Sequence, residues 1–496
     1  MRTSIFRLAM AVALVCVFAG FALAQADDPP AEPTPEPVTV APIPEPEPPA
    51  ALDQNAGAFT FGSYGRIQVT NDTEGNKGRD SNIVGHGPRL FERSYAELEF
   101  RYRLQSPVDE FGTQVLFTLA LFEPYAHQDG DFNDTFAVRN LYAEAWGFIP
   151  YVPWIYLWAG SRMVRGDDIY LLDYWPLDNL NTVGGGIGAN WQGIDARFHA
   201  GVNRLDNEYQ FQTIEVPGKV IGSREKVMLD RQRYIGSLRL QYLWPNVYRD
   251  FGMKFVAYAE QHQIPKGERI PSALIEDEVP NYEPDSITVT APEDDGYAVG
   301  GQIGFFGFGK DSHVNLFYRH AWDLAAYGEF GVPFGTNNDG TAKGATETVY
   351  ALSANYEFHW LGVLAGGYIR KFVDADVNKY DTDDFVEGAL AVRPVVFITN
   401  HLHQGFEFGY QQHYPFGLDP QTDEHEISEV FQYSAIEIVS LGRGNYKRPQ
   451  FRLTYTYSTP NAAARRTYPS GDERQLKKED HFLGFGVEWW FNSSTY

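Results

Sequence analysis

The sequence predicts an all-β fold, a transmembrane antiparallel β-barrel, on the strength of three observations. Aromatic residues make up 15% of the 496 residues, yet the mean hydropathy is only −0.35. From residue 58 onward, apolar and polar residues alternate with a period of two, and no later apolar run is as long as a membrane-spanning helix. A barrel explains all three, because its strands turn apolar residues toward lipid and polar residues toward water, with aromatic girdles at both interfaces.

Residues 1–24 are predicted to be a secretory signal peptide. Arg2 and Arg7 precede a short apolar run, and Ala22-Leu-Ala24 fits the small-residue rule of a cleavage site. The run is too short for a helix that anchors the chain in a membrane. The single cysteine, Cys16, lies inside this segment, so the mature chain is expected to form no disulfide and to bind no metal through thiolates.

Residues 25–57 are predicted to be a disordered spacer, followed by the barrel over residues 58–496. Between residues 27 and 50, prolines alternate with glutamates, a composition that cannot bury a core and favours extended polyproline conformation. Two interpretations stay open. The spacer either reaches a periplasmic partner or is a passive leader.

The alternation assigns a face to each side chain of the predicted strands. In the first strand, one parity holds Phe59, Phe61, Ile67 and Val69, and the other holds Thr60, Tyr64, Arg66 and Gln68. The next repeats the pattern, with Ala96, Leu98, Phe100, Tyr102 and Leu104 opposite Tyr95, Glu97, Glu99, Arg101 and Arg103. Further strands are predicted at 113–121, 236–244, 312–318, 405–411, 451–457 and 481–491, with long external loops at 267–295 and 410–429. A soluble β-sandwich shares the alternation but not the dense outward aromatic rows.

Charge and motifs exclude several classes of function. Acidic residues outnumber basic ones by 65 to 40, which argues against a nucleic-acid partner. The stretch WAGSRMVRGDDIYLLDYW, residues 158–175, carries Asp167, Asp168 and Asp173, which suit either a glycosidase acid–base pair or a hydrogen-bonding surface. No partner residue is singled out for catalysis, so no enzyme activity is expected. His401-Leu-His403 lacks a third ligand, and we expect neither a metal nor a cofactor.

Aromatic and charged residues recur in pairs on the inward parity. The pairs are Tyr64 with Arg66, Tyr95 with Glu97, Tyr446 with Arg448 and Trp490 with Glu488. Sugars stack their C–H faces on aromatic rings and exchange hydroxyl hydrogen bonds with arginine and carboxylate. The same pairs could also fill an ordinary polar lumen, so this pattern alone leaves the ligand open.

Several short blocks resemble the maltoporin family of sugar porins in the same order along the chain. They include Gly62-Ser-Tyr64-Gly-Arg66, Arg89-Leu90, Tyr95-Ala-Glu97-Leu98, Phe136-Ala-Val-Arg139, the stretch at 158–175, Tyr446-Lys-Arg448-Pro449 and Glu488-Trp489-Trp490. The resemblance implies a barrel of about 18 antiparallel strands with a constriction loop folded inward. It further implies a homotrimer among bacterial outer-membrane lipids that carries maltodextrins or other oligosaccharides by facilitated diffusion.

The resemblance also implies roles for individual residues. An aromatic slide that binds substrate would comprise Tyr64, Tyr95, Phe132, Phe251, Tyr446 and Trp490. A polar track at the constriction would comprise Arg66, Arg89, Glu97, Arg139, Arg165, Asp168, Asp173 and Tyr174.

The chain departs from the family pattern at some of these positions. The constriction arginine falls on Gly166, so Arg165 serves only if the loop is displaced by one residue. Phe251 is offset by one from its slide position, Phe132 would act from a neighbouring subunit, and Arg162 is expected to anchor the loop. Two alternatives stay open: a general or anion-selective porin, and a secreted β-fold carbohydrate-active enzyme or binding protein.

Overall fold

The computed structural model describes residues 57–122, 135–177, 181–217, 223–270, 288–377, 381–419 and 421–493. The chain divides into two units, 1–56 and 57–496, of which only the second is described. The predicted signal peptide (1–24), the predicted spacer apart from Gly57, and the predicted slide residue Phe132 lie outside the described residues. Within the described residues, no helix is long and apolar enough to cross a membrane.

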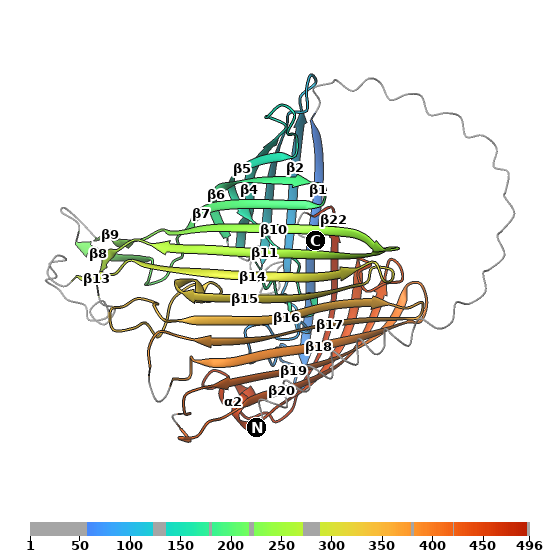
Figure 1. Ribbon diagram of the computed structural model, residues 1–496. Coiled ribbons are helices and arrows are strands. Elements are labelled where there is room, and N and C mark those ends of the chain that lie inside the picture. The colour runs from blue at the N-terminus through green and yellow to red at the C-terminus, as the bar shows by residue number, and fades with distance from the viewer. Residues whose placement is uncertain are drawn as a thin grey trace. The chain divides into compact units, whose positions relative to one another are not determined.

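Eighteen strands form a single closed antiparallel sheet (Figure 1). Strand β1 (Ala58–Asp72) pairs with β2 (Tyr95–Gln105) on one side and with β22 (Asp480–Phe491), the last strand, on the other. The others each pair with their neighbours along the chain: β3 (Gly112–Phe122), β4 (Thr135–Trp146), β5 (Ile155–Met163), β6 (Asn181–Trp191), β7 (Ile194–Asn203), β10 (Arg233–Tyr248), β11 (Phe251–Ile264), β14 (Asp294–Phe306), β15 (His313–Asp323), β16 (Thr346–Glu357), β17 (Leu361–Val373), β18 (Phe385–Phe397), β19 (Leu402–Pro415), β20 (Ser428–Ser440) and β21 (Gln450–Pro460). The predicted fold class is confirmed.

The two ends of the barrel differ in the length of their connections. Turns such as 192–193 and 249–250 close hairpins at one end, whereas the other end carries long loops such as 73–94 and 324–345. In the first of these turns, Gln192 and Gly193 both have positive φ, 48° and 84°, as two-residue hairpins require. The long-loop end therefore has room for side chains that act on whatever enters the barrel.

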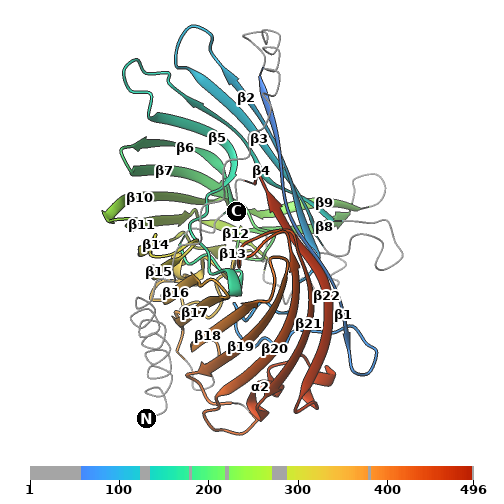
Figure 2. The same cartoon turned by 90° about the vertical axis from the view of Figure 1, so that its right-hand side faces the viewer.

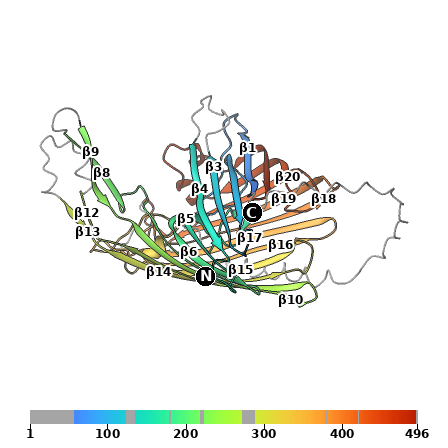
Figure 3. The ribbon, with the colours of Figure 1, turned by 90° about the horizontal axis from the view of Figure 1, so that it is seen from above.

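The remaining elements lie within the long loops. They are the hairpin pairs β8 (Phe211–Pro217) with β9 (Ser223–Asp230) and β12 (Gly267–Arg269) with β13 (Val289–Ala291), and the short helices η1 (Tyr170–Leu172), η4 (Leu324–Tyr327), α2 (Ala462–Arg466) and η5 (Glu473–Gln475). Both hairpin pairs project beyond the sheet (Figure 3). The predicted loop at 410–429 is shorter than expected, because β19 runs to Pro415 and β20 begins at Ser428.

Burial alternates along the strands as the sequence predicts. On β1, the side chains of Phe59 and Val69 are 63% and 58% exposed on the outer face, whereas Tyr64 is 1% exposed. On β2, Tyr102 lies on the exposed face and Glu97 is buried. The outer face thus carries the apolar and aromatic side chains, while the charged ones fill the lumen.

Candidate functional site

Residues 164–177 of the connection between β5 and β6 fold into the barrel, as the resemblance implies (Figure 2). Ile169 and Tyr174 form an antiparallel bridge across a tight turn in which Asp173 has a positive φ of 51°. The amide of Arg89, in the first long loop, donates to the carbonyl of Leu171 at 2.8 Å. Two loops therefore meet in the lumen and narrow it.

The apolar side of this constriction loop packs on the barrel wall. Ile169 and Leu171 are buried against β17 and β18, in a cluster that includes Leu364 and Tyr368. Gly366 on β17 allows this approach, since a Cβ at that position would overlap the Ile169 side chain. Burial of these side chains is the hydrophobic part of loop docking.

A single hydroxyl group anchors the loop on the opposite wall. Tyr170 donates to Glu488 Oε2 at 2.7 Å and accepts from Arg448 and Arg452, each at 2.7 Å. The sequence suggested Arg162 as the anchor, but Arg162 pairs with Glu144 on β4 at 2.9 Å. Sequence reasoning missed Tyr170, because its partners lie about 280 to 320 positions away along the chain.

The end of the loop nearest β5 has a separate polar anchor. Asp167 accepts from Lys254 on β11 and from Gln302 on β14. Asp167 therefore holds the loop in place. The next residue, Asp168, has no side-chain partner among the described residues, so its carboxylate is available to a ligand.

Three of the eight predicted polar-track residues, Arg66, Arg89 and Asp173, meet beside Glu488. Arg89 donates to Glu488 Oε1 and to the Tyr64 hydroxyl, both at 2.7 Å. Arg66 donates to Tyr64 at 3.1 Å and to Asp173 at 3.0 Å. The antiparallel register explains the meeting, because Arg66 lies directly opposite Glu488 across the β1–β22 ladder.

Three more predicted residues extend this group toward β4. Arg139 lies 3.5 Å from Glu97 and 5.7 Å from the Tyr95 ring centroid, and the Tyr95 hydroxyl donates to Glu97. The rings of Tyr95 and Tyr64 are 6.0 Å apart. Charged and aromatic groups thus alternate across adjacent strands.

Aromatic rings continue along the same wall beside the anchor. The Tyr170 ring lies 5.8 Å from Tyr446 and 6.3 Å from Trp490, edge to face in both cases. The guanidinium of Arg448 covers the Trp490 ring at 3.8 Å. Four of the six predicted slide residues, Tyr64, Tyr95, Tyr446 and Trp490, therefore share one wall, with Tyr170 as a fifth ring.

Phe251 does not belong to this wall. It is the first residue of β11, and its ring stacks on Phe305 at a centroid distance of 6.2 Å. Phe251 lies on the same face of the strand as the exposed Ala257, whereas Lys254 and Tyr258 lie on the other face, which is turned to the lumen. An offset of one residue along a strand moves a side chain to the other face. Its predicted place in the slide is therefore wrong.

Tyr174 belongs to the constriction loop but lies away from the aromatic wall. Its side chain is fully buried between His86, at 3.9 Å, and Tyr368, at 5.3 Å. His86 in turn contacts Glu329 at 3.0 Å. Tyr174 therefore packs the loop against its surroundings.

Arg165 and Gly166 each have a distinct environment. The Arg165 guanidinium lies 3.9 Å above the Trp175 ring. Beside Gly166, an added Cβ would lie 2.7 Å from Nη1 of Arg239, which reaches inward from β10. An arginine from the wall thus occupies the space that Gly166 leaves open. The only feature of the sequence that pointed to Arg239 was its position on the inward-facing side of a predicted strand.

The comparison with family models agrees with this architecture. The LamB porin family model matches residues 59–491. No curated protein matches the chain. Among solved structures, the chain is similar to Salmonella typhi OmpF in complex with daunomycin, with 10% identity over 88% of this chain and 98% of that chain and a TM-score of 0.39. It is also similar to Pseudomonas aeruginosa OccD3, with 8% identity over 88% of this chain and 93% of that chain and a TM-score of 0.42.

The family match covers almost the whole barrel and confirms the family that the sequence blocks resemble. It spans every strand of the closed sheet, from β1 to β22, and the constriction loop between β5 and β6. The chain therefore belongs to the LamB porin family and is an outer-membrane β-barrel porin.

Proposed function

We propose that this porin carries oligosaccharides of the maltodextrin class across the outer membrane by facilitated diffusion. The observation that supports the proposal is the wall of aromatic rings at the constriction, Tyr64, Tyr95, Tyr446 and Trp490, with arginines and carboxylates beside them. Sugar rings stack on such surfaces through their C–H faces.

The charges beside the rings suit a neutral, hydroxyl-rich solute. Arg66, Arg89 and Glu488 are already paired with one another or with neighbours. A hydroxyl that joins the network shares hydrogen bonds and does not have to displace a counter-ion. Asp168 supplies an acceptor without a side-chain partner among the described residues.

Transport by this route requires weak, repeated binding. A sugar can stack on Tyr95, Tyr446 and Trp490, whose rings are partly exposed, whereas the buried rings of Tyr64 and Tyr170 pack against them at about 6 Å and support them. Entry must be favourable and release fast, which several shallow sites achieve and one deep site does not.

The test is sugar block of single channels in planar bilayers. Maltohexaose should block the wild-type current, and Tyr95→Ala should raise the half-blocking concentration about two- to twelvefold, since one aromatic contact contributes roughly 0.5–1.5 kcal/mol. The matched control is Tyr350→Ala, whose side chain is 54% exposed on the outer face.

An unchanged block in Tyr95→Ala would show that the slide assignment is wrong. Current that no oligosaccharide blocks, with a reversal potential set by anions, would identify a general or anion-selective porin. Release of reducing sugar by the purified protein would favour the enzyme alternative.

We propose a homotrimer as the working assembly, on the basis of family membership. The species extracted in detergent should have the mass of three chains. It should dissociate to monomers, seen as a change in electrophoretic mobility, only after heating. A detergent-solubilised monomer that conducts normally would contradict this assembly.

A further inference from the structure

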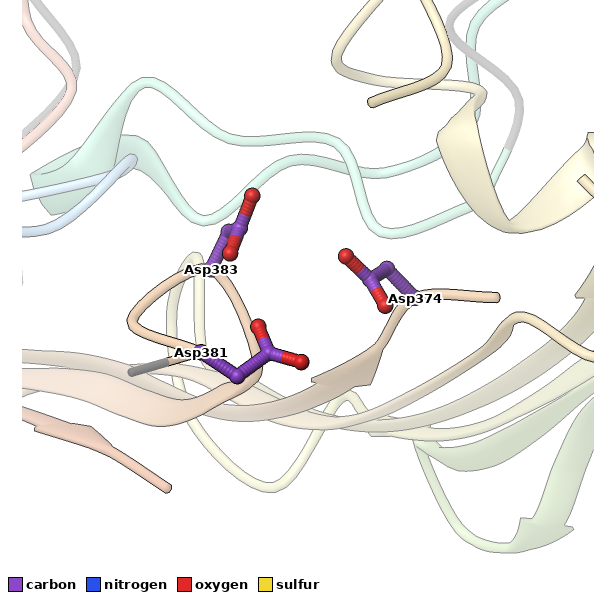
Figure 4. A group of neighbouring side chains, drawn as sticks. All are labelled: Asp374, Asp381 and Asp383. Carbon is purple, nitrogen blue, oxygen red and sulfur yellow. The ribbon is translucent and has the colours of Figure 1, made fainter. Parts of the chain in front are cut away.

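Three carboxylates meet where three long loops of the barrel come together. Asp374 and the pair Asp381 and Asp383 belong to the β17–β18 connection, and carboxylate oxygens from all three lie within 4.8 Å of one another. Figure 4 shows the three groups turned toward a common centre. From these residues we propose a divalent-cation site, with Ca²⁺ as the ion, at the outer rim of the barrel.

The environment of Asp374 points to a ligand that is absent from the protein atoms. Its side chain is only 3% exposed, and its Oδ2 atom has no hydrogen-bond partner in the part of the chain that the structure describes. Within the described residues, no lysine, arginine or histidine forms an ion pair with Asp374, Asp381 or Asp383. An ionised carboxylate buried without a partner is costly, and a bound cation removes that cost.

The donor set selects the class of ion. Three carboxylates without histidine or cysteine suit hard cations. Oxygens bound to one Ca²⁺ at about 2.3–2.6 Å each can stand no more than roughly 4.6–5.2 Å apart, and oxygens of these three carboxylates lie within 4.8 Å of one another. Water molecules would complete the coordination shell, since Asp383 is exposed.

The backbone around the site is built to hold the carboxylates in place. The amide of Ala375 donates to the carbonyl of Gly335 at 3.0 Å, and the amide of Gly417 donates to the carbonyl of Asp381 at 2.6 Å. Gly335 has a positive φ of 53°, and a Cβ there would overlap Asp374 Oδ2. Loops 324–345 and 416–427 are thus both fastened to the acidic loop.

A cation at this point would hold the loop that reaches into the lumen. Glu329, in loop 324–345, contacts Arg319 and Arg370 on the wall and His86 beside the constriction. Long loops of such barrels face the outside of the cell. The site therefore takes a cation from the external medium and makes the position of the loop depend on it.

The test is Ca²⁺ binding to the full-length protein, refolded in detergent without lipopolysaccharide and stripped with chelator. Wild type should bind about one Ca²⁺ per chain with Kd on the order of 10⁻⁴–10⁻³ M. Asp374→Asn/Asp383→Asn should weaken binding at least tenfold, and Asp383→Asn alone, an exposed position, should weaken it without any effect on folding. The control is Asp295→Asn, an exposed carboxylate on the same rim.

The proposal is overturned if wild type binds no more Ca²⁺ than the double variant, or if Asp295→Asn weakens binding as much as Asp383→Asn does. A second readout is thermal unfolding, where Ca²⁺ should raise the transition of wild type and of Asp295→Asn but not of the double variant. An equal rise in all three would place the bound ion elsewhere. Sugar block is not involved, so failure here is separate from failure of the proposed transport function.

Discussion

Removal of the Tyr170 hydroxyl should release the constriction loop from the wall. In Tyr170→Phe the ring still packs between Tyr446 and Trp490, while three hydrogen bonds at 2.7 Å disappear. Each bond involves a charged partner and contributes about 1.5–3 kcal/mol.

The net loss is smaller than the sum of the three bonds. Arg448 and Arg452 still pair with Glu488 at 2.9 and 2.6 Å, so no charge is left without a partner. We therefore expect the free energy of loop docking to fall by about 3 kcal/mol, which corresponds to the loss of two hydrogen bonds at about 1.5 kcal/mol each. Since about 1.4 kcal/mol changes an equilibrium constant tenfold, the population with an undocked loop should rise on the order of 100-fold.

Single-channel recording measures this change directly. Open-channel noise should increase in Tyr170→Phe, and mean conductance should rise because the loop spends more time away from the lumen centre. Tyr350→Phe is the matched control, because it removes a hydroxyl on the exposed outer face. Noise and conductance equal to those of wild type would refute the idea that this hydroxyl anchors the loop.

Two further predictions concern charge. Glu488→Gln leaves three arginines around a neutral side chain, so the pore should become more selective for anions. The reversal potential measured in a salt gradient should move toward the equilibrium potential of the anion. An unchanged reversal potential would count against the central role of this carboxylate. Burial, and next the Asp381 carboxylate, raises the pKa of Asp374 to about 7, and burial raises the pKa of Asp381 to about 6. Both groups hold protons more tightly in the folded state, so in EDTA the free energy of unfolding should fall as pH rises from about 4 to 7. Millimolar Ca²⁺ should oppose this fall, and identical pH profiles with and without Ca²⁺ would contradict the site.

The sequence predicts the side-chain faces of the barrel well, because parity is a local property. Tyr64 and Glu97 lie inside, and Phe59 lies outside, as the period of two indicates. Phe251 shows the limit of this reasoning. An error of one position in matching a block reverses the face, so the misplaced residue moves from the lumen to the outer surface.

The docking of the constriction loop could not be predicted from local pattern. The partners of Tyr170 come from β21, β22 and the turn before them, and the partners of Asp167 come from β11 and β14. Loop sequences carry no periodic signal that names such distant contacts. The same holds for Arg239, whose role beside Gly166 depends on where the loop lies in the lumen.

The closure between β1 and β22 gives this porin a built-in order of assembly. Tyr64 and Glu488 are 424 positions apart, and they meet only when the last strand joins the first. The two arginines and the carboxylate that hold the Tyr170 hydroxyl, together with the Trp490 ring, all belong to the final part of the chain. The anchor of the constriction loop is therefore complete only when the final strands are in place, and a barrel that stops short of closure leaves this loop unfastened on one side.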